Sequence, residues 1–135
     1  MNKFRFNWKK TILISILLVS FSSATNAELP TTIIKSCYDG DTCTTIDGEK
    51  IRLACIDTPE LKGKKADPIP AKEARDFLND LLVNEKVSIR RITTDRYGRT
   101  VAELIKDKTN IQELLVKKNL AKIYQKYKNQ CLWSK

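Results

Sequence analysis

Three short turns of this sequence carry acidic and arginine side chains next to strand-like runs. They are Asp39-Gly40-Asp41-Thr42, Asp57-Thr58-Pro59-Glu60 and Asp95-Arg96-Tyr97-Gly98-Arg99. Hard divalent cations prefer oxygen ligands, so two carboxylates and a backbone carbonyl at a strand end suit calcium. We expect Asp41, Asp57 and the Thr58 carbonyl to be such ligands if the fold brings the turns together. Taken alone, acidic residues in turns are more often plain turn formers.

Two arginines could supply positive charge to the same region. Arg52 lies within an apolar strand-like run, where an unpaired guanidinium is costly, so it needs an acid or a bound anion beside it. Arg99 ends the third turn and can offer its planar fork to a phosphate. A divalent cation and two arginines would stabilise the charge that builds on a phosphodiester during attack by water. Glu60 would orient or deprotonate that water.

The absence of histidine excludes several kinds of active site. None of the 135 residues is a histidine. Ser-His and Cys-His nucleophile pairs, histidine general bases and the usual histidine zinc sites are therefore excluded. Any chemistry must rely on carboxylates, arginines, lysines, tyrosines or a metal bound by oxygen.

The first 27 residues have the pattern of a secretory signal peptide. Four basic residues precede an apolar run over residues 11–21, and Thr25-Asn26-Ala27 is a small-residue cleavage site. The alternative is an uncleaved membrane anchor, but the apolar run is shorter than the ~20 residues that a spanning helix needs. We expect a secreted domain over residues 28–135, in the periplasm or the medium, without stable membrane association.

The expected mature domain is modestly basic. Cleavage after Ala27 removes four basic residues and no acidic one, so the formal charge falls from +9 to +5. A basic excess favours polyanionic partners such as nucleic acid, although a need for solubility explains it equally well. The remaining length suits one small domain and not two.

Four cysteines follow the expected cleavage site, and three pairings are possible. An even number in a small exported domain indicates disulfides, which stabilise a chain with a limited core. Cys37 and Cys43 flank the first acidic turn symmetrically and could bridge a hairpin, which would leave Cys55 to pair with Cys131. A four-cysteine zinc site is the alternative, but no C-x-x-C spacing favours it.

Strand-like and helical patterns alternate along residues 28–135. We expect strands at residues 33–37, 42–46, 49–56, 87–92 and 101–105, with Asp47-Gly48 as a hairpin turn. Helical spacing of apolar residues predicts one helix over 71–82, and Asn110 with Glu113 forms a capping box for another over 111–118. These elements predict an α+β fold, a small five-stranded antiparallel β-barrel of the OB type with two short packed helices.

The three turns, in this order and spacing, resemble the staphylococcal nuclease (thermonuclease) family. The resemblance rests on these turns, on the run Arg52-Leu53-Ala54-Cys55-Ile56 that leads into the second, and on the segment that follows Asn110. It covers about residues 33–127, most of the expected mature domain. It implies an OB-type barrel with helices and calcium-dependent cleavage of DNA and RNA to 3′-phosphate products.

The resemblance also implies roles for individual residues. The metal ligands would be Asp41, Asp57 and the Thr58 carbonyl, with Glu60 acting near the ion through water. The residues at catalytic positions of the family are Arg52, Glu60 and Arg99. The residues at nucleotide-contacting positions are Arg96, Tyr97, Tyr124 and Tyr127.

The C-terminal end departs from the family pattern. The family continues into a third helix before a Leu-Trp pair, whereas here Cys131-Leu132-Trp133 follows the second helical region almost at once. We expect this to lower stability more than it changes the chemistry, because every matched catalytic position lies upstream. A disulfide between Cys55 and Cys131 would offset part of the loss, by ~3–4 kcal/mol for so long a loop.

The sequence therefore favours a secreted nuclease of low sequence specificity that acts on DNA and RNA. One alternative is a non-catalytic OB-type module that only binds nucleic acid, since such barrels serve binding as readily as chemistry. Another is an inactive, truncated nuclease. A pure binding module does not need the five residues Asp41, Arg52, Asp57, Glu60 and Arg99 together, and this combination favours the enzyme.

Overall fold

The structure is a computed structural model that describes residues 26–135. The predicted signal peptide lies almost entirely outside the described residues, so it stays a prediction. Within residues 26–135 no helix combines the length and the apolar character needed to cross a bilayer.

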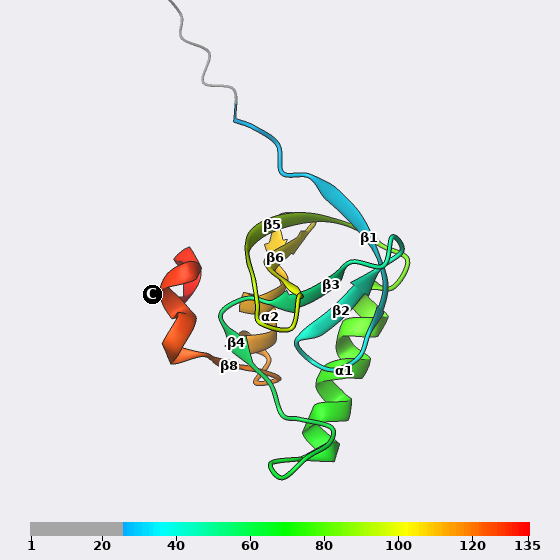
Figure 1. Ribbon diagram of the computed structural model, residues 1–135, viewed down its shortest axis with the longest axis vertical. Helices are drawn as coiled ribbons and strands as arrows, with labels where there is room; N and C mark the ends of the chain where they lie inside the picture. The colour runs from blue at the N-terminus through cyan, green and yellow to red at the C-terminus, as the bar shows by residue number, and fades with distance from the viewer. Residues whose placement is uncertain (1–25) are drawn as a thin grey trace, which may run out of the picture.

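Five strands close into a barrel (Figure 1). They are β1 (Thr31–Cys37), β2 (Thr42–Thr45), β3 (Lys50–Leu53), β5 (Lys86–Thr94) and β6 (Thr100–Lys106). β1 pairs antiparallel with β2 and β5, β2 with β3, and β5 with β6. The barrel closes where β3 pairs with β6, and this pairing is parallel. The predicted five-stranded OB-type α+β fold is confirmed, but the barrel is mixed and not wholly antiparallel.

The parallel pairing has a topological reason. A parallel pair cannot be joined by a tight hairpin and needs a long crossover. Here the crossover from β3 to β6 contains a helix and all of β5. Hairpin signals in the sequence predict pairings between neighbouring strands only, so they could not reveal which distant strands meet.

The strand predicted over residues 49–56 is wrong in its second half. β3 ends at Leu53, and β4 (Ile56–Asp57) is a separate strand that pairs with β8 (Lys122–Ile123). Between them, Cys55 has a φ of 65°, in the left-handed region. This turn redirects the chain and brings the acidic residues that follow out of the barrel wall.

Two α-helices pack on the barrel, as predicted. α1 (Pro68–Leu82) has 15 residues and begins earlier than the predicted residue 71. Pro68 and Pro70 occupy its first turn, where a missing N–H is tolerated, so they start the helix and do not exclude it. α2 (Ile111–Lys117) follows the short strand β7 (Thr109–Asn110). The side chain of Asn110 accepts the backbone N–H of Glu113, which confirms the predicted cap.

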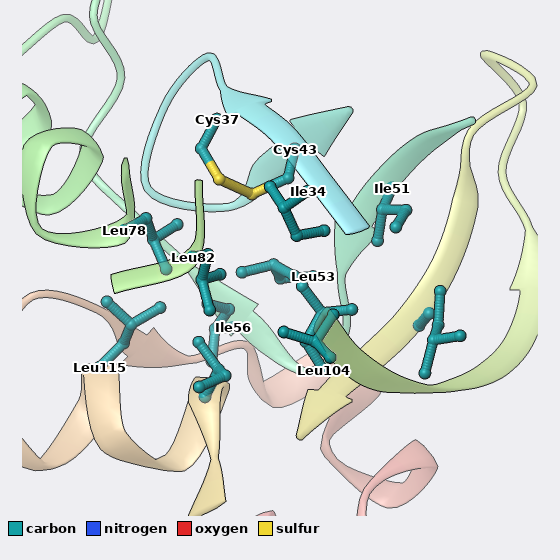
Figure 2. Close-up of a cluster of buried hydrophobic side chains, with 14 of the residues drawn as sticks. Ile34, Cys37, Cys43, Ile51, Leu53, Ile56, Leu78, Leu82, Leu104 and Leu115 are labelled. Atoms are coloured by element: carbon teal, nitrogen blue, oxygen red, sulfur yellow. A yellow bond between two sulfur atoms is a disulfide. The ribbon is translucent and has the colours of Figure 1, made fainter. Parts of the chain in front are cut away.

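The hydrophobic core lies between the barrel and the two helices. Leu78 and Leu82 of α1 and Leu115 of α2 are buried against barrel residues such as Leu53 and Leu104 (Figure 2). Burying each such side chain contributes about 1.5–3 kcal/mol. Leu53 at the end of β3 and Ile56 of β4 belong to this core, so the strand ends next to the predicted site are anchored in it.

The chain after α2 forms no further α-helix within the described residues. It continues through β8 into two 3-10 helices, η1 (Gln125–Gln130) and η2 (Leu132–Ser134). In Figure 1 this orange and red segment and α1 are on different sides of the barrel.

Candidate functional site

A cavity of about 710 Å³ lies where the three acidic turns meet the C-terminal segment. Every residue predicted for the site lines this cavity. These residues are Asp41, Arg52, Asp57, Thr58, Glu60, Arg96, Tyr97, Arg99, Tyr124 and Tyr127. The fold thus brings together residues that the sequence carries in four separate segments, while their individual roles stay predictions.

Arg52 occupies the floor between β3 and β4. Its guanidinium donates to the carbonyls of Leu53 (2.6 Å) and Ile56 (3.0 Å) and lies 3.2 Å from a carboxylate oxygen of Asp41. The side chains of Arg52 and Asp41 are only 15% and 10% exposed. The expectation that Arg52 needs an acid beside it is confirmed. The two carbonyls also explain why the chain can turn at Cys55, because Arg52 satisfies the oxygens on both sides of that turn.

Asp41 is buried at the edge of the cavity. One of its oxygens accepts the hydroxyl of Thr58 (3.0 Å) and the other accepts that of Thr42 (3.1 Å). The turn that carries Asp41 packs tightly on α1, since a Cβ on Gly40 would lie 2.8 Å from the Cβ of Ala74. Glycine is therefore required here by close approach, and the tight packing holds Asp41 in place.

Asp39 is a member of the site that sequence reasoning treated only as a turn former. Burial, followed by the neighbouring charge of Asp41, raises the pKa of Asp39 to about 6. Its side chain accepts the backbone N–H of Asp41 (3.0 Å). The sequence did contain a signal for the raised pKa of Asp39, namely two acids two positions apart in one turn. Two carboxylates held so close repel each other, which favours the protonated form of one of them.

The donor groups fit a hard divalent cation. Asp41, Asp57 and Thr58 carry oxygen donors of the kind such an ion prefers, and these residues of neighbouring turns line one cavity. Within residues 26–135 no three Asp, Glu, His or Cys side chains form a metal-binding cluster. Two carboxylates and a carbonyl would therefore leave several positions of such an ion to water or substrate oxygens, as is usual for hard cations.

Arg99 is oriented by the β5–β6 turn. Its Nε donates to Asp95 (2.8 Å), its backbone N–H donates to the other oxygen of Asp95 (3.0 Å), and a terminal nitrogen donates to the Thr42 hydroxyl (3.2 Å). Burial would raise the pKa of Asp95, but the hydrogen bonds from Arg99 and Tyr97 hold it below its ordinary value. Asp95 is thus an ionised anchor for Arg99, a role that the sequence alone did not assign.

Glu60 differs from the other acids because its carboxylate is exposed and unbonded. Among residues 26–135 no hydrogen bond or ion pair engages its side chain. Its backbone is held, since its carbonyl accepts the N–H of Asp67 (2.9 Å), the residue just before α1. A carboxylate with fixed backbone and free oxygens is available to bind and deprotonate a water.

Tyrosines form the rim of the cavity. Tyr97 lies beneath two guanidinium groups, with Arg96 4.8 Å and Arg99 5.4 Å from its ring centre. Tyr124 and Tyr127 form an edge-to-face pair with ring centres 5.1 Å apart. Tyr38, which sequence reasoning did not consider, also lines the cavity.

Two disulfides hold the walls of the cavity. Cys37 pairs with Cys43 across the β1–β2 turn, and Cys55 pairs with Cys131. The pairing suggested by the symmetric flanking of the first turn is confirmed, and the zinc alternative is wrong because no described cysteine is free.

Comparison with known proteins gives relatives of one kind. The family described as staphylococcal nuclease homologue matches residues 50–133. An uncharacterized endonuclease of Haemophilus influenzae is 35% identical over 124 residues, which are 88% of this chain and 67% of that protein. A thermonuclease of Staphylococcus hyicus is 37% identical over 110 residues, 76% of this chain and 65% of that protein.

A match over a shorter span is the staphylococcal-like nuclease CAN1 of Arabidopsis thaliana, which is 37% identical over 79 residues, 58% of this chain and 23% of that protein. The chain spans about two thirds of the length of the two bacterial relatives and less than a quarter of the plant one. The family match covers more than half of the chain and includes the second and third acidic turns. The chain belongs to the staphylococcal nuclease family.

Proposed function

We propose that this protein is a secreted, calcium-dependent nuclease that hydrolyses phosphodiester bonds of DNA and RNA with low sequence specificity. The observation that carries the proposal is the convergence of Asp41, Arg52, Asp57, Glu60 and Arg99 on one cavity. A module that only binds nucleic acid does not need a buried arginine-carboxylate pair and a free carboxylate in the same pocket. Homologues named endonuclease and thermonuclease support the same conclusion.

The proposed reaction uses the two arginines and Glu60 on one phosphodiester. Arg52 and Arg99 donate to the non-bridging phosphate oxygens, where negative charge builds in the transition state. Glu60 takes a proton from a water whose oxygen forms a bond to phosphorus. The bond between phosphorus and the 5′ oxygen then breaks, which leaves a 3′-phosphate and, after the 5′ oxygen gains a proton, a 5′-hydroxyl.

A calcium ion bound by Asp41, Asp57 and the Thr58 carbonyl would supply charge neutralisation at the phosphate. Asp41 lies beside Arg52, so the proposed ion site and an arginine proposed to bind the phosphate are adjacent. The Thr58 hydroxyl bond to Asp41 orients the carboxylate, so that Thr58 contributes through both its side chain and its carbonyl.

Low sequence specificity follows from the kinds of residue on the rim. Arg96 can contact the phosphate backbone, and the rings of Tyr97, Tyr124 and Tyr127 can stack on any base. Stacking accepts every base because each has an aromatic face. Contacts of this type position a strand without reading its sequence.

Export is supported by the signal-peptide pattern and by the two disulfides. Disulfides form and persist in oxidising compartments such as the periplasm and the extracellular medium. The domain of residues 28–135 retains all of the residues assigned to the site.

The proposal is tested by hydrolysis of a fluorescence-quenched DNA strand with the oxidised protein, first with calcium and then with a chelator. We expect cleavage that depends on calcium. Glu60→Gln should lower turnover by at least about 100-fold, the contribution of a general base, while DNA affinity changes little. The matched control is Glu73→Gln, the same change on the exposed surface of α1, which should cleave as the parent does.

Other outcomes separate the alternatives. Equal losses of turnover and affinity in Glu60→Gln would contradict the role of Glu60. A protein that melts cooperatively but never cleaves would be a binding module. A protein that neither melts cooperatively nor cleaves would be an inactive truncated nuclease.

A further inference from the structure

All four tyrosines of the chain line the same cavity. Three of them have ring contacts with neighbouring side chains. Tyr97 lies beside Arg96 and Arg99, and Tyr124 pairs with Tyr127. Tyr38 differs, because within residues 26–135 no aromatic ring or cation stacks on it and its hydroxyl makes no hydrogen bond. It is 60% exposed.

The backbone beneath Tyr38 is held from several directions. Its N–H donates to the carbonyl of Thr42 (2.8 Å), which closes the turn. The preceding residue, Cys37, is bonded to Cys43, and both its N–H (2.8 Å) and its carbonyl (3.0 Å) are bound by the side chain of Asn79 on α1. Tyr38 therefore projects from a rigid base, so binding to it costs little conformational entropy.

Tyr38 lies on a different wall of the cavity from the pair formed by Tyr124 and Tyr127. The β1–β2 turn is attached to α1 through Asn79 and through the close contact of Gly40 with Ala74. Tyr124 and Tyr127 belong to the C-terminal segment, away from α1 in Figure 1. The two groups of rings thus belong to separate elements on the rim of one cavity.

We propose that Tyr38 is an additional stacking site for an unpaired base of the bound strand, separate from the site formed by Tyr124 and Tyr127. An exposed aromatic face beside a cavity lined with arginines matches a nucleobase next to its phosphate. A base can stack on Tyr38 only if it is free of its complementary strand, so this contact favours single-stranded over duplex nucleic acid. The inference rests on the proposed function, because it requires that a nucleic-acid strand occupies the cavity.

The experiment measures binding without cleavage in the Glu60→Gln protein. Its fluorescence anisotropy is followed with an oligothymidine of about ten nucleotides, within the range that one OB-type barrel covers. Tyr38→Ala, made in the same background, should weaken binding by about tenfold, within the range for a stacking aromatic residue. Tyr38→Phe should stay within about twofold of the parent, since the ring and not the hydroxyl carries the contact.

An abasic oligonucleotide of the same length identifies what Tyr38 contacts. It keeps the phosphates and lacks the bases, so Tyr38→Ala should bind it as the parent does. The dependence of affinity on salt should also be unchanged, because that slope reports phosphate contacts. The matched control is Ile69→Ala, which removes an exposed apolar side chain of α1 that does not line the cavity and should bind both strands as the parent does.

Four outcomes would overturn the inference. These are equal affinities of Tyr38→Ala and the parent for oligothymidine, equal losses on the normal and abasic strands, a changed salt slope, and a loss in Tyr38→Phe as large as in Tyr38→Ala. Failure of the Glu60→Gln parent to bind any oligonucleotide would instead overturn the proposed function. The two failures are therefore distinguishable within one set of titrations.

Discussion

The β1–β2 turn and the C-terminal segment line the same cavity, yet the fold secures them in different ways. The turn is integrated with the core: Cys37 is bonded to Cys43, Asn79 of α1 binds the backbone on both sides of Cys37, and Gly40 packs against Ala74. Asp41 within this turn is also joined to Arg52.

The C-terminal segment lies outside the barrel and is attached by other means, which are the short pairing of β8 with β4, one disulfide and several hydrogen bonds. The Cys55–Cys131 disulfide joins it to the turn after β3, and the N–H of Tyr124 donates to the carbonyl of Cys55 (2.8 Å). Glu103 of β6 accepts the indole N–H of Trp133 (2.8 Å) and is also bonded to Arg90. These contacts hold the segment on the barrel, although the described residues form no α-helix after α2.

The difference separates two tasks within one pocket. Three of the groups proposed to act at the phosphate, Asp41, Arg52 and Arg99, are held by the barrel strands and their turns, where small displacements are resisted by a packed core. Aromatic residues proposed to hold the strand lie partly on a segment outside the barrel, which is joined to it by a two-residue strand pairing, a disulfide and hydrogen bonds. We therefore expect changes in the barrel to lower turnover and changes in the C-terminal attachment to lower affinity.

The largest effect should come from Arg52→Lys on the barrel side. A lysine cannot bond the carbonyls of Leu53 and Ile56 and the Asp41 carboxylate together while also facing a phosphate. Turnover should fall by about 100- to 1,000-fold, the cost of removing one preorganised donor to the transition state. Steady-state hydrolysis of DNA measures it, and Arg91→Lys, in an exposed ion pair outside the cavity, is the control.

Near-normal turnover in Arg52→Lys would show that the barrel side does not carry the chemistry. A large loss in the Arg91→Lys control would mean that arginine pairs act on the fold in general and not on this site.

A smaller effect on activity should follow from removal of the Cys55–Cys131 disulfide on the C-terminal side. The double variant Cys55→Ser, Cys131→Ser should lose about 3–4 kcal/mol in the free energy of unfolding, because the disulfide closes a long loop. Affinity for a DNA strand should fall by about tenfold as Tyr124 and Tyr127 lose their support, with less change in turnover at saturating substrate. Urea melts and titrations with DNA measure the two quantities.

The Cys37–Cys43 disulfide provides the matching test for the β1–β2 turn. Cys37→Ser, Cys43→Ser loosens the turn that carries Asp41, so turnover at saturating substrate should fall in this variant. If both double variants lose affinity and turnover in the same proportion, the two walls do not perform separate tasks.

The smallest effect should be the pH-dependent loss of stability that comes from protonation of Glu49, which lies outside the cavity. The hydrogen bonds from Arg91, and also that from Thr100, hold the pKa of Glu49 below its ordinary value of 4.5. A lowered folded-state pKa stabilises the protein above the unfolded-state value, and this stabilisation disappears as the pH falls through the folded-state value. Wild type should exceed Glu49→Gln in stability by under about 1 kcal/mol near neutral pH, and the difference should shrink as the pH falls below 4.5 and through the folded-state pKa.

Urea melts of the two proteins between neutral pH and about pH 3 measure this difference. Neither turnover nor affinity should change in Glu49→Gln near neutral pH. A difference that grows on acidification would contradict the direction of the pKa shift.

Local patterns in the sequence were sufficient for most of the secondary structure and for the choice of residues that line the cavity. Alternating and helical spacings located the barrel strands and α1, and the cap at Asn110 was correct. The predicted site residues of the acidic turns do line one cavity, whereas their roles stay predictions. The disulfide that spans the first turn was also suggested by local spacing.

Other features depended on contacts between residues distant in the chain. The parallel pairing of β3 with β6, the turn at Cys55 and the position of Tyr38 at the cavity could not be read from local spacing. Strand propensity says that a segment is extended but not which partner it meets, and the charge state of Asp39 depends on how deeply the closed barrel buries it. The residue types therefore predicted the available chemistry, whereas the closure of the barrel established which side chains share one cavity and how firmly each is held.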